Sequence, residues 1–141
     1  MKILFVCKGN VGRSQIAEAF FANMSKHNSA SSAGTDSRRV GVEGSRLGSG
    51  EWNTLDAMRE IGLDVSDKIS KQLTPKMVEE ADKVIVIMTA EESRRLLPEY
   101  VGRSGKVEQW EIEDARNNRE LTFAVRGIIK KRVEKLVLEI G

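Results

Sequence analysis

The chain has 141 residues, of which 40% are hydrophobic and 31% charged, an ordinary balance for a soluble domain. Its formal net charge of +2 is too small to favour nucleic acid or a membrane surface as a partner. A lone cysteine excludes an intramolecular disulfide and favours a reducing compartment. The N-terminal apolar run, residues 3–6, is too short for a signal peptide or a membrane span. We therefore expect a cytoplasmic protein that forms one domain over residues 1–141.

The first part of the chain predicts two strands and two helices. Residues 1–6 form an apolar run typical of a strand buried on both faces of a parallel sheet. Residues 14–26 have apolar positions at helical spacing, and residues 29–34 predict a second strand. Residues 35–50 are polar and rich in glycine, which predicts a long loop. The helix that follows is expected to end at Gly62, and its apolar residues are Trp52, Leu55, Met58 and Ile61.

The second part predicts three helices and two strands. A threonine followed by proline is typical of a helix start and opens a short helix over residues 74–81. Residues 83–88 predict a central strand, and residues 90–97 a helix that Pro98 ends. Residues 106–110 predict a last strand. A long amphipathic helix is expected over residues 118–140.

Strands that alternate with helices predict an α/β fold with three layers, in which helices cover both faces of a four-stranded parallel sheet. In such sheets ligands bind at the carboxyl ends of the strands. The segment Cys7-Lys8-Gly9-Asn10-Val11-Gly12-Arg13-Ser14, which we call the cysteine loop, leaves the first strand at that end.

The cysteine loop has the residue types that are needed to hold a phosphoryl group next to a thiolate. A following helix N-terminus and Arg13 both favour the anionic form of Cys7. Backbone N–H groups from Lys8 to Ser14 can surround an oxyanion, and Gly9 and Gly12 permit close approach. Arg13 can bind two phosphate oxygens at once, with the sulfur beneath phosphorus. A lone cysteine after a strand is more often a small buried hydrophobe, but this combination favours a nucleophile.

The residues from Val6 to Ser14, continuing through Ala17-Glu18, resemble the signature of the low-molecular-weight protein tyrosine phosphatases. That superfamily also contains arsenate reductases and protein arginine phosphatases. The resemblance covers nearly the whole chain, and its other segments are Ser32-Ala33-Gly34-Thr35, Ile61-Gly62-Leu63-Asp64-Val65-Ser66 and Ile112-Glu113-Asp114. It implies a four-stranded parallel sheet and phosphomonoester hydrolysis through phosphocysteine, without a metal or cofactor.

The resemblance also implies roles for individual residues. Cys7 would be the nucleophile and Arg13 the clamp on the transferred phosphoryl group. Asn10 would hold the loop's shape, together with Ser32. Asp114 would be the general acid and then the general base, with Glu113 as the fallback. The phosphate-binding residues would be Lys8, Gly9, Asn10, Val11, Gly12, Arg13 and Ser14.

Several positions depart from the family's pattern. Ala115 replaces the proline that usually follows the acid, which predicts a more mobile acid. Gly12 replaces a second cysteine, so that no protein thiol can resolve an oxidised Cys7, and a thiol relay within the chain is disfavoured. The histidine that often follows the middle turn is also missing, since Asp67 and Lys68 occupy that stretch.

The aromatic walls of the phosphotyrosine pocket also look absent. By alignment, arginines occupy the two positions, Arg38 and Arg116. Trp52 and Trp110 are expected to be core or loop anchors instead. An arginine-lined pocket predicts a substrate that is more acidic or less aromatic than a phosphotyrosine peptide. Val11 at its loop position favours tyrosine over arginine phosphatases.

The leading hypothesis is therefore a phosphatase that acts on a phosphorylated protein or a small phosphomonoester, with phosphate or another oxyanion bound in the loop. A phosphocysteine carrier of a sugar phosphotransferase system is an alternative, which Arg13 disfavours. A binding protein for phosphate or arsenate on the same scaffold, or an arsenate reductase that uses an external thiol, remains open.

Overall fold

The computed structural model describes residues 1–37, 46–49 and 51–141 of the chain. Four parallel strands form one sheet in the order β2-β1-β3-β4, which confirms the predicted α/β class. The strands are β1 (Lys2–Cys7), β2 (Ser29–Gly34), β3 (Lys83–Ile87) and β4 (Val107–Trp110). Within the described residues, no helix combines the length and the apolar character that crossing a membrane requires.

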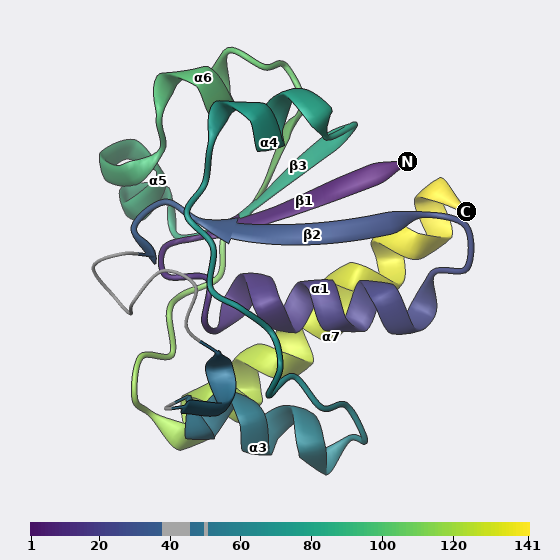
Figure 1. Cartoon of the computed structure of the whole chain (residues 1–141), viewed down its shortest axis with the longest axis vertical. Coiled ribbons are helices and arrows are strands. Elements are labelled where there is room, and N and C mark those ends of the chain that lie inside the picture. Colours follow the sequence, from purple (N-terminus) through teal and green to yellow (C-terminus); the bar gives the residue numbers. More distant parts are fainter. Residues whose placement is uncertain (38–45, 50) are drawn as a thin grey trace.

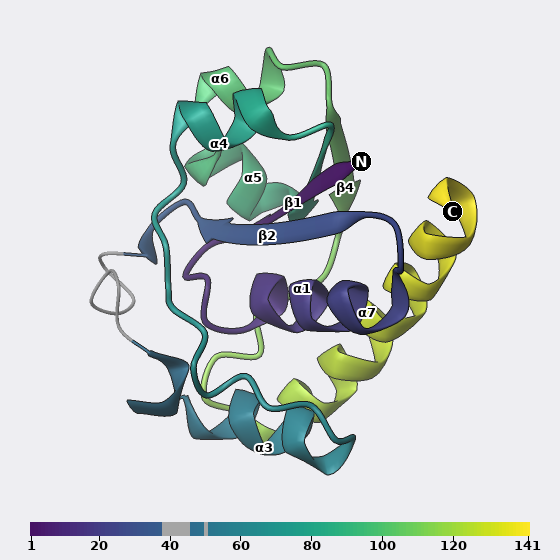
Figure 2. The ribbon, with the colours of Figure 1, turned by 45° about the vertical axis from the view of Figure 1, so that its right-hand side comes forward.

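Helices cover both faces of the sheet (Figure 1). One face carries α1 (Arg13–Met24), α3 (Trp52–Glu60) and α7 (Arg119–Ile140). The opposite face carries α4 (Pro75–Glu80), α5 (Ala90–Leu96) and α6 (Glu99–Gly102). Figure 2 shows the same three layers from a second side, with α1 and α7 packed against each other below the strands.

The two central strands divide the hydrophobic core by the two-residue period of β structure. In β1, Ile3 and Phe5 join the cluster under α1 and α7, whereas Leu4 and Val6 join the cluster under α4 and α6. Both faces of β1 are therefore buried, which explains the uninterrupted apolar run at the start of the sequence.

Local sequence signals account for several helix ends. The Thr74 side chain accepts a hydrogen bond from Met77 N at 3.3 Å, and Pro75 occupies the first turn of α4. Asn118 caps α7 in the same way, with Leu121 N at 2.9 Å. After α3 the chain turns at Gly62, whose φ of +84° favours glycine. These ends lie where the sequence predicts them.

The structure differs from the predicted elements at three places. A short 3-10 helix, η1 (Leu47–Ser49), lies within the predicted loop, and its Leu47 is buried. The additional helix α6 begins directly after Pro98, because proline ends one helix but is compatible with the first turn of the next. Trp52 is 60% exposed, so the expectation of a core or loop anchor is wrong for it, whereas Trp110 is in the core.

Candidate active site

The cysteine loop connects the end of β1 to the start of α1, and its first residues are held against the end of β2. Cys7 O accepts a hydrogen bond from Thr35 N at 2.9 Å, and Lys8 O accepts one from Asp36 N at 2.8 Å. Gly34 permits this contact, because a Cβ at that position would lie 2.6 Å from Lys8 O. The loop therefore begins on the sheet itself.

The sulfur of Cys7 faces hydrogen-bond donors. Asn10 N donates to Sγ at 3.4 Å, and Ser14 Oγ lies 3.0 Å from Sγ. Ser14 Oγ also accepts a hydrogen bond from Asn10 Nδ2 at 2.8 Å, which leaves the Ser14 hydroxyl hydrogen free to point at the sulfur. The sulfur therefore lies among groups that can donate hydrogen bonds to it.

Asn10 is the centre of a buried network that shapes the loop. It is fully buried and adopts a left-handed backbone with φ of 57°. Its Nδ2 donates to Ser32 Oγ at 2.9 Å, the contact that the family resemblance implies. Its Oδ1 accepts from Lys71 N at 2.9 Å and from Gln15 Nε2 at 3.2 Å. Gln15 and Lys71 are not identified by the sequence, since backbone donors and buried amides leave no motif.

Arg13 is buried and oriented by partners on the far side of the site. Its Nη1 and Nη2 donate to the Glu92 carboxylate at 2.8 and 2.9 Å, and Nη1 also donates to Ile112 O at 2.9 Å. Nε–H and one Nη2 hydrogen remain without a hydrogen-bond partner among the described residues. Two parallel donors on one edge match the oxygens of phosphate.

The Arg13–Glu92 pair stays charged despite its burial. Burial alone would lower the pKa of Arg13, but the hydrogen bonding of Arg13 to the Glu92 carboxylate and the charges of Cys7, Glu92 and Asp114 raise it on balance. Burial would likewise raise the pKa of Glu92, but its hydrogen bonds with Arg13 and Thr89 lower that pKa to about 2. Glu92 therefore holds Arg13 as a fixed cation at the cysteine loop.

The sequence does not identify Glu92 as a site residue. Thr89 and Glu92 form a capping box, in which Glu92 N donates to Thr89 Oγ1 at 3.2 Å and Thr89 N donates to Glu92 Oε1 at 3.0 Å. The Thr-x-x-Glu spacing signals this cap in the sequence. The contact with Arg13 has no such signal, because the two residues are 79 positions apart.

Asp114 lies at the open side of the site, with a side chain that is 44% exposed. Its Oδ2 is 3.9 Å from Arg13 Nη2, and its Oδ1 accepts a hydrogen bond from Arg116 N at 2.9 Å. Arg116 has a left-handed φ of 53°. This turn orients the carboxylate where the family usually has a proline. Glu113 lines a neighbouring hollow, whereas Asp114 lines both that hollow and the cavity that contains Cys7 and Arg13.

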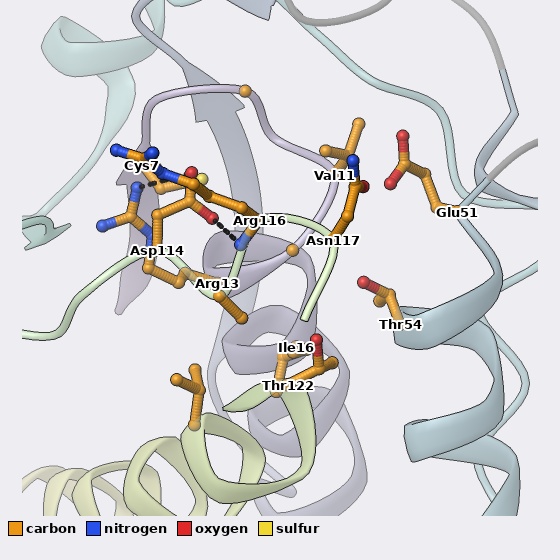
Figure 3. Close-up of a pocket in the computed structure, with 14 residues that line it drawn as sticks. Cys7, Val11, Arg13, Ile16, Glu51, Thr54, Asp114, Arg116, Asn117 and Thr122 are labelled. Carbon is orange, nitrogen blue, oxygen red and sulfur yellow. Dashed lines mark hydrogen bonds and ion pairs between the residues drawn. The ribbon is translucent and has the colours of Figure 1, made fainter. Parts of the chain in front are cut away.

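These groups surround a cavity of about 290 Å³ (Figure 3). Five loop residues line it, namely Cys7, Gly9, Val11, Gly12 and Arg13. Asn10 and Ser14 are buried behind the loop and do not line the cavity, and Lys8 lines the neighbouring hollow. The other lining residues are Ile16, Glu51, Thr54, Asp114, Ala115, Arg116, Asn117, Thr122 and Val125.

The walls of this cavity carry no aromatic side chain from the described ranges. Arg116 lies at the wall where the resemblance places it, whereas Arg38 falls outside the described residues. Glu51 and Thr54 form the wall opposite Asp114 (Figure 3). The sequence does not identify these two, because α3 reaches the site only through tertiary packing.

A family model described as low molecular weight phosphotyrosine protein phosphatase matches residues 2–141. The chain belongs to this family. It is thus an enzyme of the low-molecular-weight phosphotyrosine phosphatase family. The sheet order and the position of the cysteine loop at the end of β1 agree with this assignment.

Relatives within this family differ in the reaction that their names give. The chain is 31% identical to a glutaredoxin arsenate reductase of Synechocystis sp., over 99% of this chain and 98% of that protein. It is 30% identical to a probable low molecular weight protein-tyrosine-phosphatase of Ralstonia solanacearum, over 86% of this chain and 82% of that protein. A solved structure of an arsenate reductase in the phosphate binding state is 29% identical, covers 99% of this chain and 98% of its own, and has a TM-score of 0.79.

Proposed function

We propose that this protein is a phosphatase that hydrolyses phosphomonoesters through a phosphocysteine intermediate. The observation that carries the proposal is the convergence of Cys7, Arg13 and Asp114 on one cavity at the carboxyl end of β1. A nucleophile, a fixed cation and a carboxylate are the three groups that this chemistry needs. The lone cysteine favours action in the cytoplasm.

The proposed reaction has two displacement steps at phosphorus. The Cys7 thiolate forms an S–P bond while the P–O bond to the leaving group breaks, and Asp114 gives a proton to that oxygen. Asp114 then takes a proton from water, which attacks phosphocysteine and releases phosphate. Arg13 stays bound to the phosphoryl oxygens in both steps, and Ser14 stabilises the departing sulfur.

Substitution of the nucleophile and the acid tests this mechanism. We expect Cys7→Ser to abolish hydrolysis of 4-nitrophenyl phosphate, with or without a chelator. Asp114→Asn should lower kcat by about 10²- to 10⁴-fold for substrates with a poor leaving group, because proton donation is lost. Steady-state kinetics with phenyl phosphate measures this effect.

Glu113→Gln is the matched control, since it removes a neighbouring carboxylate that does not line the cavity. Its kcat should be close to that of the unmodified enzyme. Full activity of the Cys7→Ser variant would disprove the covalent mechanism, and a large loss in Glu113→Gln alone would move the acid to that residue.

A second candidate is arsenate reduction with an external thiol, which the reductase relatives favour. Cys7 would displace hydroxide from arsenate. An external thiol would then attack the sulfur, release arsenite with two electrons and leave a mixed disulfide for a second thiol to reduce. An external thiol is required because the chain has no second cysteine. This candidate is tested by measuring arsenite formation with glutathione and glutaredoxin, or with mycothiol, and comparing it with phosphate release from a phosphomonoester.

Tight binding of phosphate and arsenate without turnover of either would instead indicate a binding protein.

A further inference from the structure

The wall of the cavity opposite Asp114 carries an acidic side chain that the proposed chemistry does not use. Glu51 directly precedes α3, is half-buried and lines the same cavity as Cys7 and Arg13. Figure 3 shows its carboxylate pointing toward the cavity on the side of Val11 and Asn117. It therefore faces the space that a leaving group would occupy after its phosphoryl group binds the cysteine loop.

No structural role explains the position of the Glu51 side chain among the described residues. It occupies the N-cap position of α3, yet its side chain makes no capping hydrogen bond. Its carboxylate also forms no ion pair with any cation in the described ranges. Burial, followed by the charge of Asp114, raises the pKa of Glu51. A carboxylate in this environment is stabilised by a positive charge or by strong donors.

The position of Glu51 also affects which substrates can bind. A phosphoryl group already carries negative charge, so a second carboxylate in the cavity opposes the binding of an anionic or acidic leaving group. A leaving group with a cation offsets that repulsion. Arg116 favours an acidic leaving group at its own wall, whereas Glu51 favours a cationic one at the opposite wall.

We propose that Glu51 is a specificity-determining residue that selects phosphomonoesters whose leaving group carries a protonated amine. The kinetic test of this inference rests on the proposed phosphatase function. Thr54, on the next turn of α3, and Asn117 line the same part of the cavity and can supply further polar contacts to the ammonium group.

A matched pair of substrates tests this selectivity: 4-(aminomethyl)phenyl phosphate and 4-methylphenyl phosphate. The ratio of their kcat/KM values should fall about tenfold in Glu51→Gln, the factor for loss of one hydrogen bond between charged groups. The intrinsic reactivities of the two substrates cancel when ratios are compared between variants. Glu60→Gln is the control, because it removes the same charge from an exposed position at the end of α3.

The ratio should stay unchanged in Glu60→Gln, and an unchanged ratio in Glu51→Gln overturns the proposal. An equal loss for both substrates in Glu51→Gln also overturns it, since that result indicates a structural or acid–base role. The sign of the change is part of the test, because improved use of the amine substrate contradicts the proposed contact.

A binding measurement separates this inference from the proposed function. Calorimetry with benzylphosphonate and 4-(aminomethyl)benzylphosphonate requires no turnover. If the protein hydrolyses no phosphomonoester, the proposed function fails, but an amine preference that Glu51→Gln removes still supports the inference. Equal affinities for the two phosphonates, or no binding of either, overturn it.

Discussion

At the scale of single residues, close backbone packing shapes the cysteine loop as much as its reactive side chains do. Gly34, the last residue of β2, lies against Lys8 and Asn10, and a Cβ there would approach Lys8 O to 2.6 Å and Asn10 N to 2.9 Å. Both neighbours are backbone atoms of the cysteine loop. If either atom moves, the backbone N–H groups of the loop change direction.

Gly34→Ala should therefore displace the loop. We expect the free energy of unfolding to fall by about 1–3 kcal/mol, as for other overpacked sites, and the affinity for phosphate to weaken. Urea unfolding and a phosphate titration measure the two effects. Gly127→Ala is the control, because nothing lies within 4 Å of its added Cβ and alanine favours the interior of α7, by about 0.5–1 kcal/mol. Unchanged phosphate affinity in Gly34→Ala would argue against this role of the glycine.

At the scale of elements, α5 combines a local and a long-range role in one residue. Glu92 completes the capping box that starts the helix and also receives both Nη groups of Arg13. A helix start on one face of the sheet is thereby connected to the first residue of α1 on the other. The orientation of Arg13 depends on α5 as well as on the cysteine loop.

This contact predicts a pH dependence of stability. The pKa of Glu92 in the folded protein, about 2, is below its ordinary value of 4.5, so its stabilising effect is present above pH 4.5. That effect is lost as the pH falls from 4.5 toward 2, because over this range the unfolded state binds the proton more readily than the folded state. The stability difference between the unmodified protein and Glu92→Gln should shrink over this range, and urea unfolding at several pH values measures it.

Thr89→Ala is the control for this prediction. It removes the threonine part of the cap, at a cost of about 1 kcal/mol, and leaves the Arg13 pair intact. Its stability difference from the unmodified protein should depend on pH less than that of Glu92→Gln, because the Thr89 side chain makes the smallest contribution to the low pKa of Glu92. A pH dependence as large in Thr89→Ala as in Glu92→Gln would assign the effect to the helix cap instead of the ion pair.

At the scale of the whole molecule, the long helix α7 covers the larger core cluster and packs against α1, which begins at the active site. Ile129 of α7 belongs to this cluster and is fully buried, whereas Leu138 on the same helix is 85% exposed. The two positions thus separate the contribution of the core from that of the helix itself.

Ile129→Ala should lower the free energy of unfolding by about 2–5 kcal/mol, because it removes buried methyl groups and leaves a cavity. Leu138→Ala should change it by less than about 0.5 kcal/mol. Chemical denaturation of both variants measures the difference. Equal destabilisation by the two substitutions would contradict the assigned burial of α7.

Much of this architecture can be predicted from sequence, because its signals are local. The apolar run before Cys7, the Thr74-Pro75 start and the glycine stop at position 62 each act within a few residues. The spacing of Cys7 and Arg13 likewise predicts an oxyanion loop. The exposure of Trp52 was not predictable, since helical periodicity does not say which residue of a first turn faces solvent.

The order of strands and helices and the chemistry of the cysteine loop follow from the sequence, because residues that are adjacent in the chain carry both. What surrounds that loop follows from the tertiary fold alone. It brings Glu92 to Arg13, Lys71 N to Asn10, and Glu51 to the wall opposite Asp114. These contacts join segments from separate helices and loops. Their distances depend on tertiary packing, such as that of α3 against α7, which no local pattern encodes.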